Sequence, residues 1–226
     1  MKKNQKKNSS ELYAVIGLGR FGMALARELA AKGKSLLVID YDREKINEVL
    51  EFTDNAFVIN SLTIDALEET GIGEADVAVV CIGEKIDISI LATLNLMKLG
   101  VKRVISKAMS EEQGEVLKLL GAEVVYPEHD MALRLASKLV SPHILEYISL
   151  SSSIDIMEIR MTPIIDGVSV IDSGLRDKFG LNVIALCHGD EMTTDIRPTT
   201  KLIKGDTITV IGKKENIAKL EEYLGS

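Results

Sequence analysis

The sequence lacks tryptophan altogether and has only two cysteines and four prolines among its 226 residues. Two cysteines cannot build the disulfide framework of a small secreted domain, and these two are too far apart for a Cys-x-x-Cys metal pair. Cys81 and Cys187 both lie inside apolar runs, so we expect them to be buried, small hydrophobic side chains in a reducing compartment. A disulfide-stapled fold and a cysteine metal centre are therefore excluded.

Long apolar runs are also missing. None approaches the ~20 residues that a membrane-spanning helix needs. The lysine-rich start, MKKNQKKNSS, continues without the apolar core of a signal peptide. We expect residues 1–10 to be a flexible tail, with a basic arm for an acidic surface as the alternative. These features predict a cytoplasmic chain with no direct membrane insertion.

Positive charge is scarce. The chain has 27 Lys and Arg against 34 Asp and Glu, a formal charge of −7, and four of the lysines lie in the first ten residues. An acidic globular part is poorly suited to a phosphate backbone, so no nucleic acid polymer is expected as a partner. The hydrophobic share of 46% is ample for a folded core.

Short β-branched runs alternate with amphipathic stretches over residues 11–140. The runs are apolar on both faces, which is typical of parallel strands covered by helices on both sides. Helices are expected between them, including 21–32, 86–99 and 111–120, each followed by a glycine. The expected strands are 13–16, 36–39, 57–59, 77–82, 104–105 and 124–126. This order predicts an α/β domain with a Rossmann-like, doubly wound parallel sheet.

The pattern changes after residue 140. Ser141-Pro142 interrupts it, and we assign 141–153 to a linker with a short helical stretch from His143 and a serine-rich end. Residues 154–226 then predict a second, smaller α+β domain. Its expected elements are strands at 154–161, 182–187, 192–196 and 207–211, a turn at Gly189-Asp190, and helices at 175–179 and 214–224.

A glycine-rich loop, Gly17-Leu18-Gly19-Arg20-Phe21-Gly22, follows the first expected strand and opens the first expected helix. The first glycine of such a loop allows a tight turn, the second lets a phosphate approach, and the third lets the helix pack on the strand. The helix N-terminus offers free N–H groups to an anion. A purely structural glycine-rich turn is the alternative.

Asp40 ends the second expected strand. Its carboxylate can accept hydrogen bonds from ribose hydroxyls and would repel a 2′-phosphate, which favours NAD or an adenine nucleotide over NADP. A helix cap is the alternative role, although Asp42 fits that position better.

Further candidates follow the other strands at the same edge of the sheet, where ligands bind in this fold. Arg20 can form a bidentate contact with a phosphate or can be a solvated helix residue. Each of the others could also be a plain surface residue. They are Asn60, Ser61, Ile82, Gly83, Glu84, Lys107 and Glu128.

The sequence contains none of the motifs that would make this site catalytic. It has no G-x-S-x-G, H-E-x-x-H or Walker lysine motif, and His129, His143 and His188 have neither triad nor metal spacing. A dehydrogenase needs a substrate domain with an acid/base group, for which we expect no room at this length. We expect a protein that is not an enzyme, with a small NAD(H)-dependent oxidoreductase as the alternative.

Several stretches occur together: the loop of residues 17–22, Asp40, Lys107, the Tyr126-Pro127-Glu128 corner, residues 174–183 and Lys204-Gly205-Asp206-Thr207. In this combination the chain resembles the N-terminal regulator-of-potassium-conductance (RCK) domain and its companion C-terminal domain. The resemblance covers nearly all of residues 11–224, with the domain order of the regulatory subunits of Ktr/Trk potassium-uptake systems. It implies dimers that form a ring, octameric by our expectation, beneath a membrane potassium-channel subunit.

The resemblance also implies ligands: ATP against ADP, or NAD and NADH, bound by the N-terminal domain. The implied roles are the terminal phosphate for Arg20, the ribose for Asp40, the adenosine or phosphate surroundings for Gly83 and Lys107, and a cation near the nucleotide for Glu128. Asn60-Ser61-Leu62 departs from the Gly-Asp-Ala of many members, so a nucleotide contact there stays open.

The C-terminal domain of several relatives binds cyclic di-AMP, and the family pattern falls here on Arg176, Asn182 and Pro198, with Val183 and Ile184 beside Asn182. A guanidinium suits a phosphodiester and an amide suits a base edge. An exposed helix residue and a turn residue are the alternative roles for Arg176 and Asn182. A stand-alone cyclic di-AMP receptor is a further alternative for the whole chain.

Overall fold

The computed structural model describes residues 11–140, 144–151 and 153–225. The expected tail at 1–10 and the Ser141-Pro142-His143 break lie outside the described residues. The chain folds into two compact units that divide after Glu128. Within the described residues, no helix is both long enough and apolar enough to cross a bilayer.

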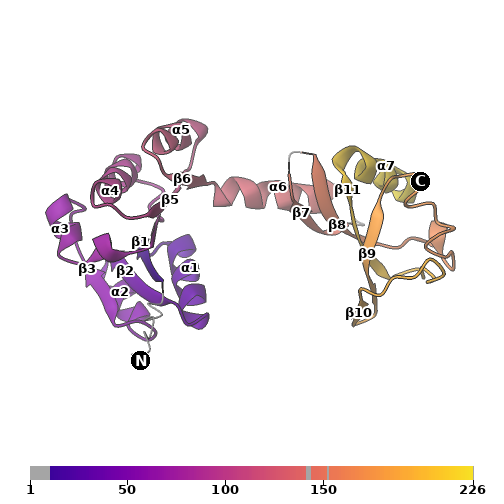
Figure 1. The fold of residues 1–226 in the computed structure, drawn as a ribbon, viewed down its shortest axis with the longest axis horizontal. Helices are drawn as coiled ribbons and strands as arrows, with labels where there is room; N and C mark the ends of the chain where they lie inside the picture. Colours follow the sequence, from indigo (N-terminus) through magenta and orange to yellow (C-terminus); the bar gives the residue numbers. More distant parts are fainter. Residues whose placement is uncertain (1–10, 141–143, 152, 226) are drawn as a thin grey trace, which may run out of the picture. The chain divides into compact units, whose positions relative to one another are not determined.

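The first unit is built on a six-stranded parallel sheet with strand order β3-β2-β1-β4-β5-β6 (Figure 1). The strands are β1 Leu12–Ile16, β2 Ser35–Asp40, β3 Asn55–Val58, β4 Val77–Val80, β5 Arg103–Lys107 and β6 Glu123–Val125. Connections leave β1 and β4 in opposite directions, so a crevice opens at the carboxyl ends of these two neighbouring strands. The predicted Rossmann-like, doubly wound parallel sheet is confirmed.

Helices cover both faces of this sheet, because its strands are apolar on both sides. Leu67 and Leu96, on α3 and α4, pack with Ile16 and Ile39 on one face. On the other face, Ala26 of α1 packs in a separate cluster with β1, β2 and α2. The helices are α1 Arg20–Ala31, α2 Arg43–Val49, α3 Ile64–Glu68, α4 Ile86–Lys98 and α5 Glu111–Leu119, with a 3₁₀ turn η1 at Ile72–Glu74.

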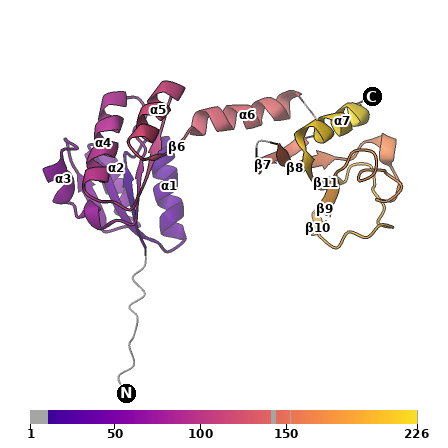
Figure 2. The ribbon, with the colours of Figure 1, turned by 45° about the horizontal axis from the view of Figure 1, so that its top comes forward.

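The second unit contains a five-stranded sheet of order β10-β9-β11-β8-β7, in which neighbouring strands are antiparallel. Its elements are α6 Pro127–Val140, which begins just before the division, β7 Ile144–Ser149, β8 Ile154–Arg160, η2 Pro163–Ile165, β9 Asn182–His188, β10 Glu191–Thr193, β11 Thr207–Lys213 and α7 Lys214–Gly225. The helix α7 packs on β11 and β8 (Figure 2) and contributes Ile217 and Leu220 to the core of this unit. The predicted smaller α+β part is confirmed.

Two local predictions are wrong. The stretch that we expected to be helical from His143, within the assigned linker, forms the edge strand β7 at Ile144–Ser149. It pairs with β8, and between the two strands the Ser151 hydroxyl accepts from the N–H of Ile154 at 3.1 Å. This pairing overrides the local helical pattern.

The second wrong prediction is the helix at 175–179. That stretch is a run of turns, with i to i−4 hydrogen bonds from the N–H of Lys178 to Gly174 and from the N–H of Gly180 to Arg176. These bonds do not propagate into a helix.

Candidate functional site

The glycine-rich loop closes tightly over the end of β1. Gly17 has φ +94°, a left-handed conformation that favours glycine, and its N–H donates to the Ile39 carbonyl at 2.8 Å. A Cβ on Gly22 would lie 1.9 Å from the Gly17 carbonyl oxygen. Gly17 and Gly22 are therefore required by the backbone and by the packing of α1 on the loop.

Gly19 has no such requirement. Its φ of −68° suits any residue, and a Cβ there would meet no atom within 4 Å. It is the N-cap residue of α1, and no side chain caps that helix end. The space above the helix N-terminus is open, and the N–H groups there are the kind that bind an anion.

Asp40 fastens this loop from the end of β2. Its side chain is buried, and its carboxylate accepts the Leu18 N–H and, at 2.8 Å, the Asp42 N–H. Asp42 is the helix cap: it accepts the Glu44 N–H at 2.9 Å at the start of α2. Asp42 is thus the helix cap, as expected, whereas Asp40 holds the glycine-rich loop in place.

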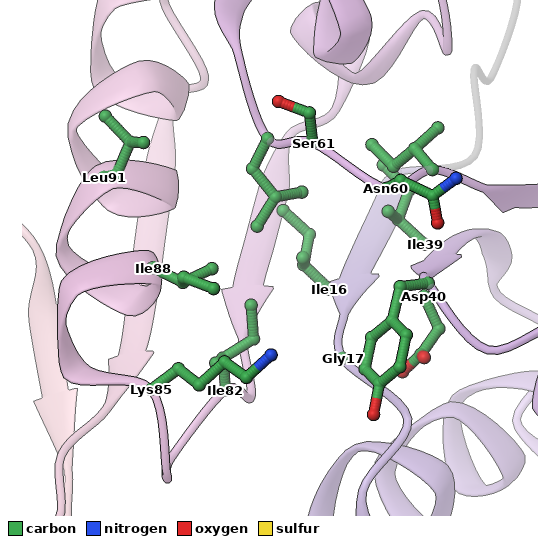
Figure 3. Close-up of a pocket in the computed structure, with 13 residues that line it drawn as sticks. Ile16, Gly17, Ile39, Asp40, Asn60, Ser61, Ile82, Lys85, Ile88 and Leu91 are labelled. Atoms are coloured by element: carbon green, nitrogen blue, oxygen red, sulfur yellow. The ribbon is translucent and has the colours of Figure 1, made fainter.

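A cavity of about 350 Å³ opens beside the loop, over the carboxyl ends of β1, β2 and β4 (Figure 3). It brings together five of the predicted residues: Gly17, Asp40, Asn60, Ser61 and Ile82. The other lining residues, which the sequence analysis did not select, are Ile16, Ile39, Tyr41, Ile59, Leu62, Lys85, Ile88 and Leu91. Tyr41 follows β2 directly, and Lys85 ends the loop that follows β4, so the rule about strand ends could have found them.

Other predicted residues gather outside this cavity, at the end of β5. The Lys107 Nζ lies 2.5 Å from Glu128 Oε1, and the Lys107 side chain is only 10% exposed. This ion pair lowers the pKa of Glu128, and the nearby charge of Arg20 lowers it further. A Cβ on Gly83 would lie 3.3 Å from the Lys107 Nζ, so the glycine leaves room for the lysine. Gly83, Lys107 and Glu128 are therefore neighbours at the end of β5. Together with Arg20, whose charge acts on Glu128, we call them the charged group beside the loop.

Apart from Gly19 and Gly22 of the loop itself, two predicted residues contribute to neither set. Phe21 packs into the core cluster on the α1 face of the sheet. Glu84 is exposed in the loop between β4 and α4.

The predicted cation at Glu128 does not fit the side chains of this chain alone. Glu128 is paired with Lys107, and Arg20 adds a second positive charge beside it. Within the described residues, no group of three or more His, Cys, Asp or Glu side chains could hold a metal ion.

The two cysteines differ in their surroundings. Cys81 is buried in the first unit, and burial raises the pKa of its thiol to about 12, against a small opposing effect of Lys107. The predicted burial holds for Cys81, which stays protonated at neutral pH. Cys187 is only half-buried, because it lies on β9 close to the hairpin turn, where its thiol contacts the Gly189 carbonyl at 3.3 Å.

The second unit has its own cavity, of about 310 Å³. Arg176, Asn182, Val183 and Pro198 all line it, and the Arg176 Nε donates to Asn182 Oδ1 at 2.8 Å. Ile184, the next residue along β9, does not line it. The remaining lining residues are Val170, Ile171, Leu175, Asp177, Leu181, Ile196 and Arg197.

Comparison with known families gives two matches that follow this division of the chain. Residues 13–127 match the TrkA-N domain model, and residues 156–225 match the TrkA-C domain model. The first match covers nearly all of the parallel sheet, and the second covers the antiparallel sheet except β7 and the start of β8.

The chain is also similar to complete curated proteins. It is 35% identical to the Ktr system potassium uptake protein C of Bacillus subtilis, over 93% of this chain and 96% of the relative. It is 32% identical to the Ktr system potassium uptake protein A of Vibrio alginolyticus, over 94% and 97%.

Among solved structures, the GsuK channel bound to NAD superposes with a TM-score of 0.62 at 20% identity, over 96% of this chain and 40% of that chain. The TrkA-N domain of the inner membrane protein ybaL of Escherichia coli gives 0.53 at 19% identity, over 58% and 98%. These likenesses show the fold.

Proposed function

Because the chain belongs to the family of Ktr system potassium uptake proteins, built from a TrkA-N and a TrkA-C domain, we propose that it is a regulatory subunit of a potassium-uptake channel. In this proposal a nucleotide bound in the first unit controls the channel. The observation that carries it is the glycine-rich loop, held by Asp40 beside a cavity at the crevice of the sheet.

The nucleotide would lie with its phosphates at the N-terminus of α1 and its adenosine toward the cavity. The uncapped helix end and the open space at Gly19 support the phosphate position. Asp40 supports the ribose position, because each carboxylate oxygen has a lone pair beyond the one used by the backbone N–H. ATP and ADP are the proposed pair, with NAD and NADH as the alternative.

The charged group beside the loop supplies a means to sense the terminal phosphate. Glu128 now neutralises Lys107 and lies near Arg20. A terminal phosphate next to Arg20 competes with Glu128 for both cations, and ADP competes less because it lacks that group. Only such a difference in contacts can shift a conformational equilibrium.

Glu128 connects this competition to the rest of the chain. It is the second residue of α6, which runs from the end of β6 into the second unit. When a phosphate draws Lys107 away, the first turn of α6 loses the contact that ties it to β5. The nucleotide thereby changes the restraint on the helix that links the two units.

The second unit is the proposed site for cyclic di-AMP. Its cavity holds a guanidinium, an amide and an apolar wall from Arg176, Asn182, Val183 and Pro198. Arg176 donates to the Asn182 side chain. A phosphodiester offers this guanidinium a charged partner in place of a neutral amide, which makes a stronger hydrogen bond.

The proposed partners follow from the family. The chain would form dimers and an octameric ring on the cytoplasmic face of a membrane potassium-channel subunit, with no catalytic activity of its own. A channel subunit that co-purifies with the chain from membranes supports this, and repeated failure to co-purify favours a stand-alone receptor. Turnover of NADH with a panel of oxo acids would instead favour the oxidoreductase alternative.

The direct test is calorimetry of the purified chain with ATP and ADP, for the wild type and for Arg20→Gln. A charge-assisted contact of about 1.5–3 kcal/mol predicts that ATP affinity falls about 10- to 150-fold. ADP affinity is expected to fall much less.

Arg27→Gln is the matched control. Arg27 lies on the same helix and pairs with Glu48, away from the loop. It should leave both affinities unchanged. Equal losses of ATP and ADP in Arg20→Gln would remove the terminal-phosphate role of Arg20.

A further inference from the structure

Tyr41 lies at the mouth of the first cavity without contributing to the core. It follows Asp40 directly, and its side chain is 65% exposed although it borders the cavity. The residues before it in β2 are buried on both faces of the sheet. Folding therefore gives no reason for an aromatic ring at this position.

Two lysines lie close to the exposed ring. The Nζ of Lys85 lies 5.5 Å from the Tyr41 ring centroid, and that of Lys45 lies 5.7 Å from it. Lys45 also has Asp42 at 3.9 Å, whereas Lys85 has no carboxylate oxygen within 4.0 Å in the described part of the chain. Lys85 is the N-cap residue of α4, where the helix dipole disfavours a cation. The cation–π contact with the Tyr41 ring is therefore the interaction that holds the Lys85 ammonium group.

This contact crosses the crevice. Tyr41 follows β2 and Lys85 follows β4, and the strand β1 lies between them in the sheet. Figure 3 shows Lys85 extending from the start of α4 toward the side of the cavity that holds Asp40. Asp40, Tyr41 and Lys85 line the same cavity, so a nucleoside whose ribose reaches Asp40 has the Tyr41 ring within its reach.

The rest of the cavity suits a flat apolar ligand. Ile59, Ile82, Ile88 and Leu91 line it with aliphatic side chains. We propose that Tyr41 is the residue on which the purine base of the nucleotide stacks, and that Lys85 occupies its ring until the base displaces it. This inference rests on the proposed function and adds the residue that recognises the base.

The magnitudes favour displacement. Stacking of a base on an aromatic side chain is worth roughly a 5- to 150-fold factor in affinity. A cation–π contact at an exposed site is worth roughly a 2- to 5-fold factor. The base therefore gains more from the ring than Lys85 loses.

The test uses the full chain with three probes in calorimetry: ATP, adenosine as its competitor, and inorganic tripolyphosphate. Tyr41→Leu should weaken ATP and adenosine by about 5- to 150-fold and leave tripolyphosphate unchanged. Tyr41→Phe, which keeps the ring, should stay within about twofold of the wild type. Lys85→Met should strengthen the neutral adenosine by about 2- to 5-fold, since no cation then has to leave the ring.

The outcomes separate this inference from the proposed function. If the wild type binds ATP and Tyr41→Leu binds it with the same affinity, the role of Tyr41 is overturned while the proposed function stands. If Lys85→Met binds adenosine more weakly than the wild type, Lys85 contacts the bound base, and the proposal that the base displaces Lys85 is overturned. A wild-type chain that binds no nucleotide overturns both proposals.

Discussion

Among single residues, Asp40 has a structural task that precedes any ligand. Its carboxylate accepts the N–H groups of Leu18 and Asp42, so it sets the path of the glycine-rich loop. The proposed contact with a ribose uses the same two oxygens. Substitutions at Asp40 therefore affect both the stability of the loop and the binding of the nucleotide.

Asp40→Asn should lower the free energy of unfolding of the first unit by about 1–3 kcal/mol, because an amide cannot accept both N–H groups and one buried donor loses its partner. Asp42→Asn is the control, since asparagine caps a helix as well as aspartate does, and it should change the stability by less than about 0.5 kcal/mol. Urea unfolding, with hydrogen exchange of residues 12–22, measures both. Equal stability of the two variants would contradict the fastening role of Asp40.

At the scale of elements, the loop before α1 and the start of that helix contain glycines that are there for different reasons. Gly22 is required by packing, because a Cβ there would overlap the Gly17 carbonyl oxygen. Gly19 is required by neither backbone nor packing. The two positions lie in one loop, so they can be compared under the same conditions.

Gly22→Ala should cost about 3 kcal/mol or more of stability, because α1 has to move away from the loop. Gly19→Ala should change the stability by less than about 1 kcal/mol, yet weaken ATP at least about tenfold by placing a methyl group where a phosphate approaches. Thermal unfolding and calorimetry measure the two effects. Unchanged ATP affinity in Gly19→Ala would contradict the phosphate position.

The first turn of α6 carries a pH-dependent contact. Lys107 holds the pKa of Glu128 below its ordinary value. A lowered folded-state pKa adds stability that is fully present above the ordinary value of about 4.3 and disappears as the pH falls through the lower folded value. Since Glu128 is 56% exposed, solvent screens the pair and the effect is modest.

Glu128→Gln should therefore destabilise the chain at pH 7 by about 1 kcal/mol, and the difference from the wild type should shrink below about pH 4. Lys107→Met should be less harmful, because it removes the buried cation, and the Glu128 carboxylate that loses its partner is 56% exposed to water. Urea unfolding between about pH 3 and 7 tests the order of the two variants. A Glu128→Gln difference that does not depend on pH would contradict the ion pair as its source.

For the whole molecule, the main point is that each unit has its own core and its own cavity. Among the residues that the structure describes, the core clusters of the first unit end at Ala122, and that of the second unit begins at Met157. The two proposed ligands therefore bind at places built from different residues.

Arg176→Ala should reduce cyclic di-AMP affinity at least about 30-fold while ATP affinity stays unchanged, because the guanidinium is the one charged group that we assign to the phosphodiester. Arg160→Ala, an exposed arginine at the end of β8, is the control and should leave both ligands unaffected. Calorimetry with each ligand decides. A variant that retains full cyclic di-AMP affinity would remove this assignment.

The sequence was sufficient where local pattern and topology agree. Strand ends at one edge of a parallel sheet predicted that Gly17, Asp40, Asn60, Ser61 and Ile82 would meet, and they do. It was insufficient where pairing between distant segments decides, as in β7, which takes its conformation from β8.

The directions and partners of individual side chains could not be predicted from the sequence either. The direction of Lys85 toward Tyr41, and the partnership of Lys107 with Glu128, depend on rotamers and on neighbours that no spacing encodes. The same holds for Phe21, which the motif placed at the ligand and packing placed in the core.

The hydrogen bonds of Asp40 weaken the inference of nucleotide binding from a sequence that has a glycine-rich loop and an acid at the end of the second strand. An acid at the end of the second strand indicates that the glycine-rich loop is ordered. A descendant protein that no longer bound a nucleotide would still need this acid to hold the loop. A glycine at position 19 is different, because nothing inside the protein requires it. In a diverging lineage, the open glycine is the residue whose replacement would signal that the ligand had gone.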